Sequence, residues 1–276
     1  MMIVAVLGAV DAVIVRLLSN EVHPFIMVFS RAVFGLMAML PWILGSPGIM
    51  KTKRFGLHFL RAALKLASLI ALFAAMARAP LATVTAIGFA SPIFVTLGAW
   101  LFFGEQRRAT RIFGIVLGFT GVIVLLQPSE GVPTVALVLA LISAVLVATI
   151  QLMLKFMGAS EKADTLVAWN LVATVPIALI PAVFVWATPS LIECGLLAVQ
   201  GAIGAASQFM VTKAFQLADA SVVSPIDFLR LPFVAAAAYI FFGEVADQST
   251  WIGAVIIFVA ILMMAVSLRN RRGLES

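Results

Sequence analysis

One short phrase occurs twice in this chain, and its two copies have different surroundings. Phe-Phe-Gly-Glu closes an apolar run at 102–105 and closes another at 241–244. The first copy is followed by Gln-Arg-Arg-Ala-Thr-Arg at 106–111, and the second by Val-Ala-Asp-Gln-Ser-Thr at 245–250. Because basic loops stay on the cytoplasmic side of a membrane, the two copies are predicted to end on opposite sides. This is the pattern of an inverted repeat.

Composition places the chain in a membrane. Of its 276 residues, 63% are hydrophobic and 11% are charged, whereas a soluble domain has about 25% charged residues. The apolar runs have the length of a helix that crosses a bilayer, and runs such as 82–103 do not alternate as barrel strands do. We therefore predict an all-α integral membrane protein with ten transmembrane helices, at about 2–19, 25–45, 56–77, 80–103, 111–127, 133–156, 165–187, 191–214, 219–242 and 250–268.

Ten spans divide into two inverted five-helix repeats. An odd number of spans per half makes the second half enter the membrane from the opposite side. A shift of 139 residues relates the halves and aligns Gly104 with Gly243 and Gly114 with Gly253. We expect the first repeat at 1–128, the second at 129–270, and a short cytoplasmic tail at 271–276.

The basic residues predict the orientation of the protein. With both termini in the cytoplasm, only Arg78 of the 18 Lys and Arg residues falls in an outer loop, and Arg16, Arg31, Lys65 and Arg230 lie at membrane depth. The other basic residues fall at cytoplasmic ends, as the positive-inside rule requires. They are Lys51, Lys53, Arg54, Arg61, Arg107, Arg108, Arg111, Lys155, Lys162, Lys213, Arg269, Arg271 and Arg272.

Several other classes of protein are disfavoured. The single cysteine, Cys194, allows no internal disulfide, and His23 and His58 lie in different segments, so we expect neither a metal site nor a cofactor. Basic residues at helix ends explain the net charge of +6 without a nucleic-acid partner. The chain contains no GxxxxGK[ST] loop for ATP hydrolysis. The first span has no basic region before it and no clear cleavage site, so we expect it to be retained rather than removed as a signal peptide.

Short motifs resemble one transporter family. They are Ala-Pro-Leu-Ala at 79–82 and Phe-Ala-Ser-Pro at 89–92 in the first half, and Ala-Asp-Ala-Ser at 218–221 and Pro-Ile-Asp-Phe-Leu-Arg at 225–230 in the second. In these stretches, and over nearly its whole length, the chain resembles the EamA group of the drug/metabolite transporter superfamily. The resemblance implies ten helices in two repeats around a central cavity that opens alternately to the two sides. Relatives usually begin with a cytoplasmic tail, so the first codon of this chain is open to misassignment.

The resemblance also implies a function. The chain is expected to be a secondary transporter of the bacterial inner (plasma) membrane for a small organic metabolite. The stretch 218–232 most resembles riboflavin and S-adenosylmethionine uptake carriers, and riboflavin uptake is the first expectation. An S-adenosylmethionine carrier, an amino-acid carrier and a metabolite exporter are the alternatives. The expected partners are the substrate and membrane lipid, with the protein as a monomer or a homodimer.

Asp227 and Arg230 are the first candidates for substrate binding. They stand three residues apart on the ninth span, so they share a helical face. An ionised group at membrane depth costs about 2.5–3.5 kcal/mol on insertion scales, so it faces a cavity, pairs or reaches the interface. Arg230 would hold a polar or anionic group of the substrate and Asp227 would orient it. Mutual neutralisation of the pair is the alternative.

Other charges lie within the first three spans. Asp11 is a candidate for proton coupling, with a salt bridge to Arg31 or Lys65 as the alternative reading. Arg31 and Lys65 are candidate substrate contacts, because an excess of buried cations favours an anionic or electron-rich substrate. Arg16 is expected to reach the interface, and Glu105 and Glu244 are expected to be structural residues at the rim.

Neutral polar and kink-forming residues complete the set. Gln151, Asn170 and Gln208 could bond to a heterocycle or an amide, as could Gln200, while Trp169 or Trp100 could offer a stacking face. Hydrogen bonds between helices are the alternative role for each. Pro92, Pro225 and Pro232 fall inside spans and are hinge candidates. Gly114 and Gly118 are expected to pack within the bundle rather than to mediate dimerisation.

Two other classes of function fit the sequence less well than a carrier does. An intramembrane enzyme needs paired carboxylates, a His with a nucleophile, or metal ligands at depth, and the sequence shows none of these in a shared motif. A channel fits charged, proline-broken inverted repeats less well than a carrier does.

Overall fold

The computed structural model describes residues 2–46, 48–103, 109–126, 132–158, 160–217 and 230–272. These residues form α-helices, and no strand occurs among them. The helices are α1 (Met2–Leu18), α2 (Pro24–Leu44), α3 (Phe55–Met76), α4 (Leu81–Gly88), α5 (Ser91–Phe103), α6 (Ala109–Leu125), α7 (Thr134–Gly158), α8 (Ala163–Phe184), α9 (Leu191–Leu217), α11 (Arg230–Phe242) and α12 (Gln248–Arg272).

The lengths and composition of these helices fit a bilayer. In the described residues, six apolar stretches are long enough to cross a membrane: Pro24–Leu44, Phe55–Met76, Leu81–Phe102, Thr134–Gly158, Asp164–Phe184 and Leu191–Val211. Shorter apolar helices cover Ile112–Leu125, Arg230–Phe242 and Gln248–Met263. The prediction of a helical integral membrane protein is confirmed.

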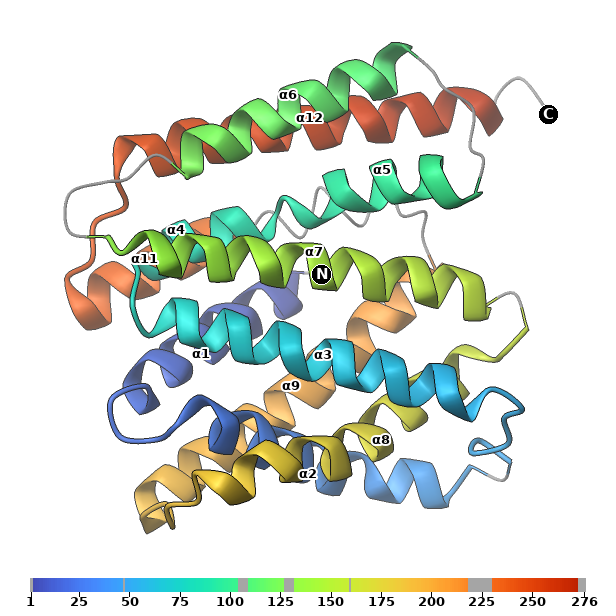
Figure 1. Ribbon diagram of the computed structural model, residues 1–276, viewed down its shortest axis with the longest axis vertical. Coiled ribbons are helices and arrows are strands. Elements are labelled where there is room, and N and C mark those ends of the chain that lie inside the picture. The colour runs from blue at the N-terminus through green and yellow to red at the C-terminus, as the bar shows by residue number, and fades with distance from the viewer. Residues whose placement is uncertain are drawn as a thin grey trace.

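The helices lie side by side, with α4 and α5 following one another in the same direction as one span, and successive spans run in opposite directions (Figure 1). Their connections therefore gather at two ends of the bundle. At the end with the α2–α3 and α7–α8 connections lie Lys51, Lys53, Arg54 and Lys162, and we call it the basic end. At the other end, which we call the acidic end, the connections and first turns carry Glu21, Glu193, Glu244 and Asp247.

The two halves of the chain are interleaved. The most extensive helix contacts join α6 to α12, α2 to α9, α3 to α7 and α1 to α11, so each pairs a helix of 1–128 with one of 129–270. Buried hydroxyl groups also join the halves, since Ser68 Oγ lies 3.0 Å from Ser143 Oγ and Thr83 Oγ1 lies 2.9 Å from Thr250 Oγ1. The core of the protein is thus shared between the halves.

Two glycines set the distance between α6 and α12. A methyl group added at Gly121 would lie 3.0 Å from the carbonyl oxygen of Gly253, and one at Gly253 would lie 3.0 Å from that of Gly121. Small residues allow this close backbone approach, which favours helix association in a membrane. Gly118 faces Ile93 of α5, and this confirms the prediction that it packs within the bundle.

The predicted span at 80–103 is interrupted in the structure. The α4 helix ends at Gly88 and α5 begins at Ser91, with Phe89 and Ala90 in a turn between them. Pro92 has no N–H to donate to the carbonyl of Gly88, so the helical ladder is broken there. The N–H groups of Phe89 and Ala90 instead donate three residues back, at 3.1 and 2.9 Å. This break places Phe89 beside Arg230.

Candidate functional site

A group of charged and polar side chains lies in the middle of the bundle, between helices of both halves. It consists of Asp11 on α1, Arg31 on α2, Lys65 on α3, Gln208 on α9 and Arg230 on α11, and we call it the central group. All five are partly buried. The sequence predicted each of them as a site residue. In the structure Arg31 pairs with Asp11, Lys65 bonds to Gln208, and Arg230 packs on α1, the helix that carries Asp11.

Arg31 forms an ion pair with Asp11 of the neighbouring helix. Its guanidinium also lies 5.7 Å from the centre of the Phe73 ring and crosses Gly204 of α9, where a methyl group would be 2.7 Å from Nη2. Three helices thus hold the arginine, and the glycine makes room for it. Of the two readings of Asp11, the salt bridge to Arg31 is present in the structure.

Lys65 bonds to a neutral partner. Its Nζ donates to Oε1 of Gln208 at 3.0 Å. Gln208 stands one helical turn after Gly204 on α9, so Arg31 and Lys65 meet the same face of that helix. The positive charges of Arg31 and Arg61 both act on Lys65. Among the described residues, no carboxylate lies within ion-pair distance of Lys65.

Arg230 opens α11 and lies against α1. Its guanidinium is 5.2 Å from the centre of the Phe89 ring, and its Cδ is 2.5 Å from where a methyl group on Gly8 would stand. Gly8 precedes Asp11 by three residues, so Arg230 crosses α1 one turn from the carboxylate. Asp227 and Pro225, its predicted partner and a hinge candidate, fall outside the described residues.

The other predicted residues lie elsewhere. Trp169 is at the basic end, where its Nε1 donates to the Met50 carbonyl at 3.1 Å. Asn170 is buried on α8, and its Oδ1 accepts no bond from the described residues. Gln151 is exposed on α7, and Pro232 is exposed in the first turn of α11. The structure therefore does not bring Trp169 into the central group.

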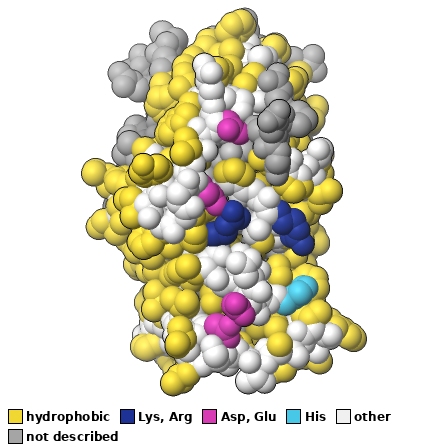
Figure 2. Space-filling view, turned by 90° about the vertical axis from the view of Figure 1, so that its left-hand side faces the viewer, with side chains coloured by type: hydrophobic (Ala, Val, Ile, Leu, Met, Phe, Trp, Pro, Cys, Tyr) yellow, Lys and Arg dark blue, Asp and Glu magenta, His cyan; other side chains and the backbone are white. Residues whose placement is uncertain are grey.

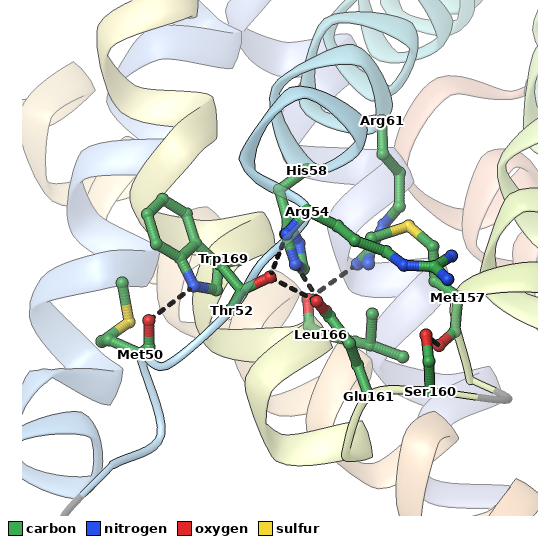
Figure 3. Close-up of polar contacts among 10 residues, drawn as sticks. All are labelled: Met50, Thr52, Arg54, His58, Arg61, Met157, Ser160, Glu161, Leu166 and Trp169. Atoms are coloured by element: carbon green, nitrogen blue, oxygen red, sulfur yellow. Dashed lines mark hydrogen bonds and ion pairs between the residues drawn. The ribbon is translucent and has the colours of Figure 1, made fainter.

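A second polar cluster at the basic end was not expected from the sequence (Figure 3). His58 Nε2 lies 2.6 Å from Glu161 Oε2, with the His58 side chain fully buried and that of Glu161 8% exposed. The Thr52 hydroxyl donates to the other Glu161 oxygen and accepts the N–H of Arg54 at 2.9 Å. The ring of Trp169 covers His58, with 5.4 Å between centroids. This His58–Glu161 cluster joins the α2–α3 region to the α7–α8 connection.

Arg61 is part of the same cluster. It was expected at the cytoplasmic interface, but it is only 3% exposed, and its Nη2 donates to the Leu166 carbonyl of α8 at 2.9 Å. One sequence signal could have found it. His58, Arg61 and Lys65 stand at i, i+3 and i+7, so they line one face of α3.

A third cluster lies at the acidic end. Arg16 Nη2 lies 2.5 Å from Glu244 Oε1, and Arg16 also donates to the carbonyls of Met76 and Ala79. Glu244 accepts the N–H of Leu81 at 2.9 Å. Arg16 is therefore held by protein groups rather than simply reaching the interface, and Glu244 has the structural contacts expected of it. Figure 2 shows this end, where charged side chains run along the middle between hydrophobic flanks.

Comparison with known proteins identifies the family. Residues 1–127 and 134–266 match the EamA-like transporter family. The chain belongs to this family. It is thus an integral membrane protein that transports small metabolites, within the drug/metabolite transporter superfamily, and not an enzyme.

Relatives with two different substrates are similar to this chain. An S-adenosylmethionine uptake transporter of Rickettsia prowazekii is 30% identical over 95% of this chain and 90% of its own length. A riboflavin transporter of Rhizobium johnstonii is 34% identical over 78% of this chain and 72% of its own length. A protein of known crystal structure shares the fold, with a TM-score of 0.66 and 14% identity over 97% of this chain and 98% of its own.

The acidic-end cluster yields a stability prediction. Replacing Glu244 by Gln removes the negative charge that pairs with Arg16. The Arg16 guanidinium is then incompletely satisfied, and a partly buried group in this state lowers the free energy of unfolding by about 1–3 kcal/mol. We expect Glu244→Gln to lower the unfolding temperature of the detergent-solubilised protein by several degrees. Asp247→Asn, an exposed carboxylate in the same connection, is the matched control and should change stability by less than about 0.5 kcal/mol. Equal unfolding temperatures for the two variants would contradict the role given to Glu244.

Proposed function

We propose that this protein is a secondary carrier that moves its substrate by alternating access of two inverted five-helix repeats with ten spans in all. Helix contacts support the repeat. In two five-span repeats, each span corresponds to the one five places later, so α2 corresponds to α8, α3 to α9 and α1 to α7. The α2–α9 contact then corresponds to the α8–α3 contact, and the α3–α7 contact to the α9–α1 contact. All four contacts occur. The pairs α6–α12, α2–α8 and α4–α11 map onto themselves, and they occur as well.

The shift of 139 residues is also supported by the helix bounds. The described helix α11 covers the residues that the shift predicts from α5, and α12 begins where the shift predicts from α6. The family match divides near residue 130, as the two predicted repeats do. The opposite directions of α1 and α7 (Figure 1) support the proposal that the second repeat is inverted relative to the first.

Alternating access has a simple physical basis in the two end clusters. The Arg16–Glu244 cluster ties α1, α3 and α4 of the first half to the connection before α12 at the acidic end. The His58–Glu161 cluster ties α3 of the first half to the α7–α8 connection at the basic end. We infer that one cluster opens while the other stays closed. The broken helix at Pro92 is the proposed hinge in the first half, and Pro225 and Pro232 are its candidates in the second.

Lys65 is the residue on which the proposed substrate site rests. A lysine in the middle of the bundle, bonded to a neutral amide and beside a second cation, is suited to an anionic group. Asp11 could receive a cationic group of the same substrate, with Arg31 and Arg230 beside it. Phe73 and Phe89 lie next to these arginines and offer apolar faces.

S-Adenosylmethionine fits this arrangement best. It carries a carboxylate for Lys65 and two cationic centres, the ammonium and the sulfonium, for Asp11. Four relatives named as its uptake transporters are 28–30% identical over 94–95% of the chain. Riboflavin, the first expectation from the sequence, is the second candidate, because riboflavin transporters at 30–34% identity and the phenylalanine faces favour it.

The function is tested by uptake of labelled S-adenosylmethionine into cells that lack their own carrier and express this chain, with riboflavin and an amino-acid mixture in parallel. We expect saturable uptake of S-adenosylmethionine and a loss of at least about tenfold, or 1.4 kcal/mol, in Lys65→Gln, because the substrate anion loses its cation. Lys51→Gln, at an exposed lysine of the basic end, is the control. Wild-type rates in Lys65→Gln, Arg230→Ala and Asp227→Asn, all present in the membrane, would refute the central site.

Proton coupling through Asp11 is a further part of the proposal. When the Asp11–Arg31 pair is broken, the Asp11 carboxylate can take up a proton. When the pair forms again, the Arg31 guanidinium takes the place of that proton beside the carboxylate. We expect collapse of the proton gradient to abolish accumulation, and Asp11→Asn to retain exchange of internal for external substrate while losing accumulation. Accumulation by Asp11→Asn equal to that of the wild type would rule out this role.

The orientation proposal places both termini and the basic end in the cytoplasm. Its support is the charge of the connections, since the basic end carries Lys51, Lys53, Arg54 and Lys162 and the acidic end carries four carboxylates. A reporter that is active only outside the cytoplasm should be active when fused after Asp247 and silent after Arg108. The reverse pattern would overturn the orientation.

A further inference from the structure

Arg61 is a buried cation with spare donors. It is 3% exposed and makes one hydrogen bond, from Nη2 to the Leu166 carbonyl. Neither Nε nor Nη1 has a hydrogen-bond partner within the described ranges. An arginine at such a position normally satisfies its fork of N–H groups on carboxylates or carbonyls, because unsatisfied buried donors are costly. The arrangement therefore needs an explanation beyond helix packing.

We propose that Arg61 is a second anion-binding subsite, which receives the carboxylate of the substrate on its way between the central group and the basic end. The inference rests on the proposed function, in which Lys65 binds that carboxylate first. The subsite adds Arg61 to the substrate-binding residues and adds a transfer step, in which the carboxylate moves from Lys65 toward the basic end.

The position of Arg61 on α3 supports this step. Arg61 and Lys65 are four residues apart, so they share one face of the helix and stand about 6 Å apart along its axis. Their charges act on each other. Two like charges one turn apart repel, and a carboxylate between them relieves the repulsion. An anion released by Lys65 toward the basic end thus meets Arg61 next.

The contacts that cover Arg61 show what the substrate would replace. Leu166 belongs to α8 and Glu161 to the connection before it, whereas Arg61 belongs to α3. The negative charge of Glu161 acts on Arg61 while its oxygens bond to His58 and Thr52. If α3 separates from α8 when the basic end opens, Arg61 loses the carbonyl of Leu166 and the charge of Glu161 together. A substrate carboxylate can replace both, because it accepts two parallel bonds from a guanidinium.

The order of events follows from this exchange. With the basic end closed, Arg61 bonds to the Leu166 carbonyl near Glu161, and the path is sealed by the His58–Glu161 contact. With that end open, the substrate anion takes the place of Glu161 and then leaves into water. Arg61 thus offsets the cost of opening only when a substrate with an anionic group is present.

The test measures transport from each face of the membrane. Right-side-out and inverted vesicles from cells that express the protein are assayed with labelled S-adenosylmethionine, and Arg61→Gln and Arg61→Lys are compared with the wild type. We expect Arg61→Gln to raise the half-saturating concentration at the face of the basic end at least about tenfold and to leave that of the other face within about twofold. Arg61→Lys, which keeps the charge but not the fork, should fall between the two.

A change of substrate separates binding from folding. Decarboxylated S-adenosylmethionine lacks the proposed ligand, so its half-saturating concentrations should be equal in Arg61→Gln and the wild type. Lys53→Gln is the control variant, since Lys53 is an exposed cation at the same end, and it should behave as the wild type. The amount of each variant in the membrane is measured by immunoblot.

Three results would overturn the subsite. They are an equal change at both faces, an equal change with the decarboxylated compound, and no change in Arg61→Gln. In each case the wild type still transports, so the proposed function stands. Absence of transport of S-adenosylmethionine by the wild type would overturn the proposed function and the subsite together.

Discussion

The cost of a charge in a low-dielectric membrane governs the interior of this protein. An ionised side chain at such depth must find a partner or a cavity. The described charges inside the bundle find partners on other helices, as Asp11 and Arg31 join α1 to α2 and Lys65 and Gln208 join α3 to α9. The polar residues therefore link particular helices in the interior of the bundle, in addition to the apolar packing that the helices share.

Glycines make these polar contacts possible. Arg31 crosses α9 at Gly204, and Arg230 crosses α1 at Gly8. A side chain at either glycine would occupy the space of the arginine, so a small residue on one helix and a long cation on its neighbour act as a unit. Glycines also allow α6 and α12 to approach each other closely, at Gly121 and Gly253, where no charge is involved. Close approach of backbones thus supports both the core and the site.

The charges are distributed unequally along the path between the two ends. The end clusters contain their own carboxylates, since Glu244 pairs with Arg16 and Glu161 bonds to His58 near Arg61. In the middle, Asp11 balances Arg31, and Lys65 has only an amide oxygen within the described residues. Under the proposed function, an anionic substrate is attracted to the centre, while each end is closed by a cluster that contains its own carboxylate. This difference is what a carrier requires, because binding must favour the centre and closure must be reversible at each end.

The sequence by itself determined the class of protein, its family and the residues that carry charge into the membrane. Hydropathy and helical length are local properties, so the helices and the positions of Asp11, Arg31, Lys65 and Arg230 within them could be predicted. Only the tertiary structure decided the partners of these residues. Arg31 rather than Lys65 pairs with Asp11, Trp169 lies with His58 at the basic end, and His58 meets Glu161 across 103 residues of sequence. The physical reason is that which helix faces which depends on the packing of all the helices together, and no single span encodes it.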